Sequence, residues 1–132
     1  MKRGKVGAIR LEYFYDTSAI YEFMQGNPKA RSFFMPPNTG AVSLLVVLEL
    51  YFILVRGGEE SKANLALEKF FPLIRDPSKS LIAKAMRFKL QHKDRGLSYA
   101  DAIGYAYAQE QAMPFLTLDS DFRGLPNVVF VR

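Results

Sequence analysis

The spacing of apolar residues changes along the first third of the chain and predicts short elements. The aromatic-rich run 11–15 (LEYFY) stops at Asp16 and predicts a strand, and the periodic stretch 19–25 (AIYEFMQ) predicts a helix that a Gly-Asn-Pro sequence ends. Residues 29–35 favour a second short helix, stopped by two prolines, and the Asn-Thr-Gly after them is a loop by composition. A short strand is then expected at 41–43.

A long apolar run occupies residues 44–55, bounded by Ser43 in front and by two glycines behind. It is too long for a typical strand, so it favours a buried helix, although a strand stays open as the alternative for its first half. The wider segment 41–55 falls short of the roughly 18 apolar residues that a membrane span needs, and it carries Glu49. We therefore expect this segment in the core and no membrane association.

The second half of the chain alternates helical and strand patterns. Apolar spacing predicts helices at 59–71, 79–93 and 98–111 and strands at 73–74, 114–118 and 128–131. The helix 79–93 is amphipathic and basic. Strands that alternate with helices are typical of parallel sheets. We therefore predict one domain over residues 1–132, a three-layer α/β/α sandwich with a central parallel β-sheet.

The composition restricts the chemistry. The chain has no cysteine and one histidine, His92, to which we assign no role, so a zinc site would need carboxylates almost alone. Oxygen ligands suit a hard cation such as Mg²⁺ or Mn²⁺. The formal charge of +5 allows a polyanionic partner. The basic extension 1–10 meets Glu12 before any long apolar region, unlike a signal peptide, so we expect a cytoplasmic protein.

Two acidic residues follow predicted strands. Asp16 comes directly after the strand 11–15, and Asp119 follows the apolar run 114–118. Because sites in open parallel sheets form outside the carboxyl ends of the strands, both side chains are candidates for one edge of the sheet. Each also has a local explanation, since Asp16 suits a helix cap and Asp119 suits a turn.

Two further acidic residues lie in predicted helices. Glu49 has only apolar residues three and four positions away, and burying an unpaired carboxylate is costly. Its partner is therefore expected elsewhere in the fold, unless this edge of the helix reaches solvent. Asp101 follows Ser98 with the spacing of a capping box, which explains it locally. A carboxylate in the first turn also points off the end of the helix, where a site at the sheet edge would lie.

Taken together, these four acidic residues predict a metal-dependent nuclease. None has a basic neighbour in sequence that accounts for it, and four carboxylates brought together repel one another unless a cation gathers them. Carboxylates that hold Mg²⁺ or Mn²⁺ are an arrangement that activates water at a phosphodiester. Setting the four aside leaves nine of the 13 acidic residues against 18 Lys and Arg, an acidic site in a basic frame.

Four motifs occur in order: Asp16-Thr17-Ser18 after the first strand, Glu49 in an apolar helix, LSYADAIGYAYA at 97–108 and LTLDSDFRGL at 116–125. Their order resembles the PIN domain, in particular the small VapC-like toxin ribonucleases of prokaryotic toxin–antitoxin pairs. The resemblance covers essentially the whole chain. It implies a Mg²⁺- or Mn²⁺-dependent endoribonuclease with a central parallel sheet, often a homodimer, that a cognate antitoxin holds inactive.

The resemblance also implies roles for individual residues. The catalytic acids, which bind the metal and the water that it activates, would be Asp16, Glu49, Asp101 and Asp119. Asp121 would share the metal or cap the turn 122–124. Supporting hydroxyl groups, equally explained as cap or strand residues, would be Thr17, Ser18 and Thr117. The extension 1–10 departs from the family pattern, in which the first aspartate commonly lies within the first few residues.

RNA and an antitoxin are the partners that the resemblance implies. Arg123, close to the acidic motif, and Lys93 and Arg95, which lead from the basic helix towards Asp101, are expected to contact RNA phosphates. For most lysines of that helix, a solvated face is the alternative. An antitoxin peptide is expected to place an Arg or Lys in the acidic pocket.

Two other functions use an acidic pocket. A phosphoacceptor receiver domain needs a lysine late in the chain to pair with its acceptor, and no lysine follows Lys93. A non-catalytic PIN-like module that binds RNA or protein is the second alternative. Metal-dependent cleavage that disappears with Asp16→Asn separates an enzyme from such a module.

Overall fold

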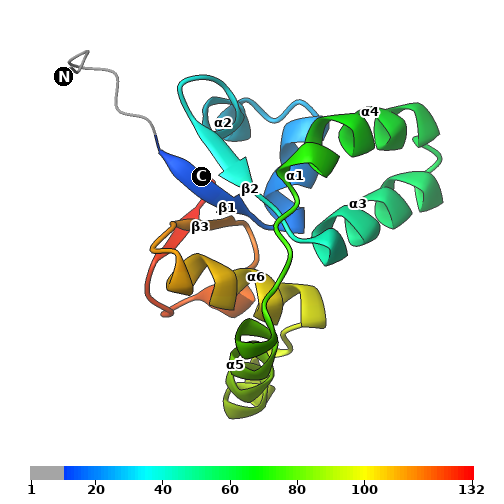
Figure 1. Ribbon diagram of the computed structural model, residues 1–132. Helices are drawn as coiled ribbons and strands as arrows, with labels where there is room; N and C mark the ends of the chain where they lie inside the picture. The colour runs from blue at the N-terminus through cyan, green and yellow to red at the C-terminus, as the bar shows by residue number, and fades with distance from the viewer. Residues whose placement is uncertain (1–10) are drawn as a thin grey trace.

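Four parallel strands form the centre of the molecule in a computed structural model that describes residues 11–132 (Figure 1). Their order in space is β2-β1-β3-β4, and every neighbouring pair is parallel. The bounds are β1 (Glu12–Tyr15), β2 (Thr39–Ala41), β3 (Phe115–Thr117) and β4 (Val128–Phe130). The basic extension predicted at 1–10 lies outside the described residues.

Helices connect the strands and cover both faces of the sheet, which gives the predicted three-layer α/β/α sandwich. The α-helices are α1 (Thr17–Met24), α2 (Pro28–Arg31), α3 (Leu44–Arg56), α4 (Glu60–Phe70), α5 (Lys79–Gln91) and α6 (Tyr99–Glu110). Short 3-10 helices are η1 (Ser32–Phe34), η2 (Phe71–Leu73), η3 (Lys93–Arg95) and η4 (Ser120–Phe122). Figure 1 shows α3 and α4 as a helical hairpin, while α5 packs against α6 at the other end of the molecule.

Alternation along β1 explains why both faces of the sheet are covered. Successive side chains of a strand point to opposite faces, and every residue from Tyr13 to Tyr15 is buried. The Phe14 ring stacks on the Phe115 ring, 5.9 Å away, beneath α6. The Tyr15 ring packs 4.2 Å from the Phe34 ring on the other face. A strand that is apolar at successive positions therefore lies between two apolar layers.

The apolar run at 44–55 is helical, as predicted, and the strand alternative for its first half is wrong. Ser43 is extended and its side-chain oxygen accepts a hydrogen bond from Val46 N at 3.1 Å, which starts α3. Leu50 and Leu54 are fully buried on the inner side of this helix. Within residues 11–132, no helix is long and apolar enough to cross a membrane.

Two strand boundaries differ from the prediction because pairing partners decide them. β2 begins at Thr39, inside the predicted loop, since Gly40 pairs with Tyr13 of β1. The brief strand predicted after the fourth helix reduces to a single bridge between Ile74 and Val42. Both corrections come from backbone pairing between residues far apart in the sequence, which local composition does not predict.

Gly104 lets α6 lie close to the sheet and gives a test of this packing. A Cβ atom at this position would lie 2.6 Å from Phe14 Cε1 and 3.3 Å from Phe115 Cε1. We expect Gly104→Ala to lower the free energy of unfolding by about 1–3 kcal/mol, because both rings belong to the packed core. The midpoint temperature of thermal unfolding should then fall by roughly 4 °C or more.

Gly57→Ala is the matched control. Gly57 ends α3 with a negative φ, and a Cβ there would approach no atom closer than 3.4 Å. The free energy of unfolding of the Gly57→Ala variant should differ from that of wild type by less than about 0.5 kcal/mol. Equal effects of the two substitutions would mean that α6 does not rest closely on the sheet.

Candidate active site

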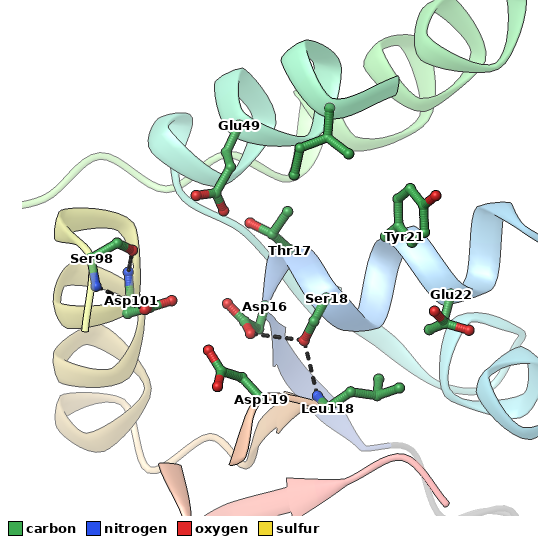
Figure 2. Close-up of a pocket in the computed structure, with 11 residues that line it drawn as sticks. Asp16, Thr17, Ser18, Tyr21, Glu22, Glu49, Ser98, Asp101, Leu118 and Asp119 are labelled. Carbon is green, nitrogen blue, oxygen red and sulfur yellow. Dashed lines mark hydrogen bonds between the residues drawn. The ribbon is translucent and has the colours of Figure 1, made fainter. Parts of the chain in front are cut away.

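A cleft of about 380 Å³ opens at the carboxyl ends of β1 and β3 (Figure 2). Residues of α1, α3, the start of α6 and the segment after β3 form its wall. The four acidic residues that the sequence singles out all line it: Asp16, Glu49, Asp101 and Asp119. Segments far apart in sequence therefore bring their carboxylates to one edge of the sheet, where open parallel sheets form their sites.

Asp16 is the most buried of the four, with 3% of its surface exposed. Its Oδ2 accepts hydrogen bonds from Thr117 Oγ1 at 2.6 Å and from Ser18 Oγ at 3.0 Å. Asp16 is the N-cap residue of α1, as its local explanation predicts, but its side chain makes no cap hydrogen bond to that helix. Two of the three predicted supporting hydroxyl groups thus hold this one carboxylate.

Ser18 and Thr117 also connect the ends of β1 and β3. Ser18 Oγ accepts a hydrogen bond from Leu118 N at 2.9 Å, and Thr117 Oγ1 accepts one from Asp119 N at 2.9 Å. The two hydroxyl oxygens lie 3.1 Å apart. The same network that holds Asp16 therefore fixes the backbone that carries Asp119.

Asp101 caps its own helix and still faces the cleft. Its Oδ2 accepts a hydrogen bond from Ser98 N at 2.8 Å, while Ser98 Oγ accepts one from Asp101 N at 3.0 Å. The predicted capping box therefore forms. Oδ1 takes no part in the box, and Figure 2 shows the side chain reaching from α6 into the cleft. Capping and membership of the site are compatible.

Asp119 divides its oxygens in the same way. Its Oδ1 accepts a hydrogen bond from Asp121 N at 2.9 Å and caps η4, so the turn role predicted for Asp119 is confirmed. Oδ2 takes no part in that bond, and the side chain lines the cleft. One carboxylate oxygen orients the side chain and leaves the other for the site.

Glu49 projects from α3 into the same cleft and is half-buried (Figure 2). None of the ion pairs within residues 11–132 involves a carboxylate of the cleft. The partner expected for Glu49 is therefore not a Lys or Arg of the described chain. Its neighbours in the cleft include three other acids, Asp16, Asp101 and Asp119.

Burial and crowding raise the pKa of two of these acids. Burial raises the pKa of Asp16 to about 7, hydrogen bonds from its two hydroxyl partners oppose the shift, and the charge of Asp101 adds to it. Burial also raises the pKa of Asp101, with further contributions from the charges of Asp119 and Glu49. These carboxylates repel one another across one cleft, and a bound cation would relieve that repulsion.

The donor set suits a hard cation that keeps part of its own water. In the described part of the chain, no three Asp, Glu or His side chains lie close enough together to hold a metal ion directly. Mg²⁺ usually keeps several waters and needs only one or two carboxylates, so this cleft matches its chemistry. The buried Thr17 hydroxyl lines the cleft and has no hydrogen-bond partner among residues 11–132, which leaves it available to such a water. The residues fit a hydrated Mg²⁺ or Mn²⁺.

Five residues predicted for the site do not line the cleft: Thr117, Asp121, Lys93, Arg95 and Arg123. Asp121 does not line it, and the cap of η4 is Asp119, so neither role expected of Asp121 is seen. Arg95, for which an RNA contact is predicted, donates from Nη1 to the carbonyl oxygens of Asp121 at 2.9 Å and Arg123 at 2.7 Å. It clamps the loop after β3 because its guanidinium offers several donors in one plane. Lys93 and the side chain of Arg123 are exposed.

The cleft has further lining residues that were not predicted from the sequence. Tyr21 and Glu22 follow one turn after the predicted hydroxyl residues of α1, and Ile53 follows one turn after Glu49 on α3. Helical periodicity from an accepted site residue finds all three, because positions three and four apart share a face. Leu118 also lines the cleft, between Thr117 and Asp119.

The raised pKa of Asp16 predicts how stability depends on pH. The folded protein holds a proton on Asp16 up to about pH 7, whereas the unfolded chain loses it near the ordinary value of 3.8. The free energy of unfolding should therefore decrease as pH rises from about 4 to about 7, by at most about 4 kcal/mol. Asp16→Asn keeps an acceptor for both hydroxyls without the charge. In urea unfolding with a chelator present, this variant should be more stable than wild type at pH 8. The difference in the free energy of unfolding between the two proteins should be smaller at pH 5.

Asp76→Asn is the control for this measurement. Asp76 is exposed in the segment before α5, so its substitution should leave the pH dependence of wild type unchanged. Parallel pH profiles for wild type and Asp16→Asn would show that Asp16 titrates at an ordinary pKa.

Comparison with solved structures finds similar folds in a toxin and in toxin–antitoxin complexes. A chain of a toxin–antitoxin complex from Klebsiella pneumoniae is 26% identical, with a TM-score of 0.70 over 89% of this chain and 95% of that chain. VapC20 of Mycobacterium tuberculosis, a sarcin-ricin loop cleaving toxin, is 21% identical, with a TM-score of 0.72 over 88% and 96%. VapBC2 from Rickettsia felis, bound to a DNA fragment from its promoter, is 16% identical, with a TM-score of 0.67 over 91% and 97%.

The family follows from the sequence comparison. No curated protein gives a significant match. The family model described as the PIN domain matches residues 13–128, which include all four acids of the cleft. The chain belongs to the PIN domain family.

Proposed function

We propose that this protein is a Mg²⁺- or Mn²⁺-dependent endoribonuclease and the toxin of a toxin–antitoxin pair. The observation that carries the proposal is the single cleft into which Asp16, Glu49, Asp101 and Asp119 project without a cationic partner among the described residues. The similarity to a chain of a toxin–antitoxin complex and to a toxin that cleaves RNA supports the same function. We propose the cytoplasm as the compartment of the activity, because the RNA substrate would be met there.

The residues of the cleft divide the work by their geometry. Asp16, Glu49, Asp101 and Asp119 would hold the cation either directly or through its coordinated waters, and Asp119 could instead hold the water that attacks the phosphodiester. When bound, the cation lowers the pKa of a coordinated water and neutralises charge on the phosphate. Ser18 and Thr117 keep Asp16 in one orientation by donating to Oδ2, so the carboxylate does not rotate when a ligand arrives.

RNA contacts beyond the cleft are proposed for exposed cations. Arg123 follows η4 and is exposed, and its backbone is held by the Arg95 clamp, so its side chain is presented from a fixed loop. Lys93 is exposed on η3. Each would contact a phosphate, which makes RNA affinity fall with salt.

An antitoxin is the protein partner that we propose for the face beside the cleft. An apolar groove borders α3 and the start of α6 and shares Glu49 with the catalytic cleft; its other lining residues include Leu48, Phe52 and Tyr99. Phe52 is 62% exposed and Tyr99 67% exposed. Such apolar exposure is typical of a surface that a partner covers. A peptide lying in this groove would also reach the acidic cleft with an Arg or Lys.

Homodimer formation is the remaining part of the proposal. Exposed apolar side chains also occur outside the groove, on α4 and η2, including Leu65 and Phe71, and they offer a second copy a surface. A non-catalytic PIN-like module stays as the alternative function, because the same cleft could bind a partner without hydrolysis.

The first test is calorimetric titration with Mn²⁺, combined with cleavage of a mixed-sequence RNA by the same samples. Asp101→Asn and Asp119→Asn both keep the oxygen that caps the backbone but remove the charge. Each substitution should weaken Mn²⁺ binding about tenfold or more, because it removes a negative charge that attracts the cation. The cleavage rate should fall about a hundredfold or more, because the bound cation activates the attacking water. Full RNA affinity in wild type without cleavage under Mn²⁺ would favour the binding module instead.

Asp121→Asn is the matched control for Asp119→Asn. The two aspartates are two positions apart, but only Asp119 lines the cleft. Asp121→Asn should therefore retain both Mn²⁺ affinity and cleavage. If it loses them as strongly as Asp119→Asn, the site includes Asp121 and the cleft has another arrangement in the active protein.

The antitoxin proposal predicts a separation of binding from catalysis. Phe52→Glu places a charge in the apolar groove, so it should abolish co-purification with the product of a neighbouring small reading frame while RNA cleavage persists. Leu90→Glu is the control, because Leu90 is 70% exposed on α5, outside both the groove and the surface proposed for a second copy. If both variants lose co-purification equally, the partner does not bind in this groove.

Sedimentation of the chain alone tests the proposed homodimer, because it measures the oligomeric state.

A further inference from the structure

A second cavity, of about 410 Å³, lies between α5, α6 and the end of the loop that follows β3. We call it the α5/α6 cavity. Lys84 and Arg87 contribute to its wall, and no acidic side chain of the described chain lines it. It is therefore the electrostatic opposite of the catalytic cleft, which is lined by carboxylates and by no Lys or Arg of residues 11–132. The charge favours an anionic ligand.

One of these cations is free to bind. Arg87 is exposed on α5 and forms no ion pair or side-chain hydrogen bond with residues 11–132. Lys84 Nζ lies 3.3 Å from Glu110 Oε2, and both side chains are partly exposed. Exposed ion pairs are weak, so a phosphate can compete for Lys84. Arg87 is the stronger candidate because a guanidinium binds a phosphate through two donors.

Three aromatic rings form a column at the side of this cavity. The Tyr105 ring lies 5.0 Å from the Phe88 ring, and the Phe88 ring lies 4.3 Å from the His92 ring. A hydrogen bond of 3.0 Å between His92 Nδ1 and the Phe88 carbonyl oxygen holds the last ring in place. The His92 ring is tilted by 36° from the Phe88 ring, and within the described residues it contacts no second ring, so it ends the column. A flat base can extend such a column by stacking.

The remaining polar groups of the cavity also suit a nucleotide. Gln91 and Gln109 line it, and each side-chain amide offers both donors and an acceptor, as the edges of bases require. An acidic peptide would use the cations but would leave the amides and the ring column without a role. Cations, amides and a terminal ring together favour single-stranded nucleic acid over an acidic protein.

The position of the α5/α6 cavity relates it to the catalytic cleft. α6 carries Asp101 in its first turn at the cleft and Gln109 near its end at the cavity, about 12 Å further along the helix axis. The loop from Asp119 to Pro126 also runs from one site to the other, with Arg123 exposed between them. A few nucleotides of an extended strand would span this distance.

We propose that the α5/α6 cavity is a secondary subsite for single-stranded RNA, in which Arg87 and Lys84 hold a phosphate and His92 stacks on a base. The inference rests on the proposed function, since it concerns the strand whose cleavage we assign to the acidic cleft. It accounts for the basic helix α5 and for His92, which the catalytic proposal leaves without a role. RNA long enough to reach from the cleft to the subsite should bind better than RNA that fills the cleft alone.

The test compares cleavage of RNAs of about 4 and about 12 nucleotides, lengths that bracket the extent of small single-strand sites. Arg87→Gln should raise KM for the longer RNA about tenfold with kcat unchanged and should leave the shorter RNA unaffected. RNA binding by Arg87→Gln should also depend less on salt, as measured by fluorescence anisotropy in a chelator. The magnitude of the slope of log K against log salt should decrease by about 0.7, because one phosphate contact is removed.

His92 gives the second arm of the test. His92→Ala should raise KM for the longer RNA about fivefold or more without changing the salt slope, whereas His92→Phe should restore wild-type KM because it keeps a stacking ring. Thermal unfolding of each variant separates these effects from loss of the fold. If His92→Ala behaves like wild type on RNA, no base stacks at this position and the subsite as proposed is wrong.

Lys79→Gln is the charge-matched control for Arg87→Gln. Lys79 begins the same helix and is exposed, but it does not line the cavity, so its substitution should change KM little. Equal effects at Lys79 and Arg87 would mean diffuse electrostatic attraction and would overturn the subsite. An acidic peptide that binds in an Arg87-dependent way, without any effect of Arg87 on RNA, would make the cavity a protein-docking site.

Failure of the subsite can be distinguished from failure of the catalytic proposal. If wild type cleaves both RNAs and Arg87→Gln does the same with equal KM, only the subsite fails. If wild type cleaves neither RNA with Mn²⁺, the nuclease proposal fails. In that case, Arg87- and His92-dependent RNA binding in the chelator would still support the subsite, and loss of that dependence would overturn it as well.

Discussion

The site depends on a buried carboxylate and the two hydroxyl groups that hold it. Asp16 Oδ2 accepts from Ser18 on α1 and from Thr117 at the end of β3, and the same hydroxyls accept from the backbone of residues 118–119. Strand ends that are separated by about a hundred residues in sequence are thereby fixed relative to one another. Each bond adds only about 1 kcal/mol of net stability, but leaving the carboxylate without partners would cost more. The network thus positions Asp119 as well as Asp16.

The carboxylates of the cleft are oriented by the backbone that they cap. Asp101 and Asp119 each give one oxygen to a nearby backbone N–H, which fixes the side chain and leaves the second oxygen for a ligand. Such fixation lowers the entropy that a bound cation would otherwise have to remove. Burial, together with a smaller contribution from repulsion among these carboxylates, raises the pKa of Asp16 and of Asp101, so their charged forms destabilise the folded protein. Strain of this kind at a functional site is expected where binding relieves it.

Charge is separated between the two ends of α6. Its N-terminal turn carries Asp101 in the acidic cleft, and its C-terminal half contributes Tyr105 and Gln109 to a cavity lined by cations. The rise of this helix therefore sets the spacing between Asp101 and Gln109, about 12 Å, while Gly104 lets the helix lie close to the sheet. An acidic cleft that takes a cation and a basic surface that takes phosphate are complementary requirements for a nuclease, because the metal and the polyanion must bind together.

Local pattern by itself determined most of the element types, though not at 73–74, and it determined the parallel α/β class and the choice of the four acids. The apolar run 44–55, the capping box at Ser98 and the aspartates after strands each follow from side-chain periodicity or hydrogen-bonding chemistry, which act over a few residues. Only the tertiary structure decided what pairs with what. Pairing with β1 extended β2 into the predicted loop at Thr39, the carbonyl oxygens of a distant loop turned Arg95 into a clamp, and the packing of α5 on α6 gave His92 a place in a ring column. These outcomes depend on contacts between segments far apart in sequence, and no local spacing encodes which partner a side chain will meet.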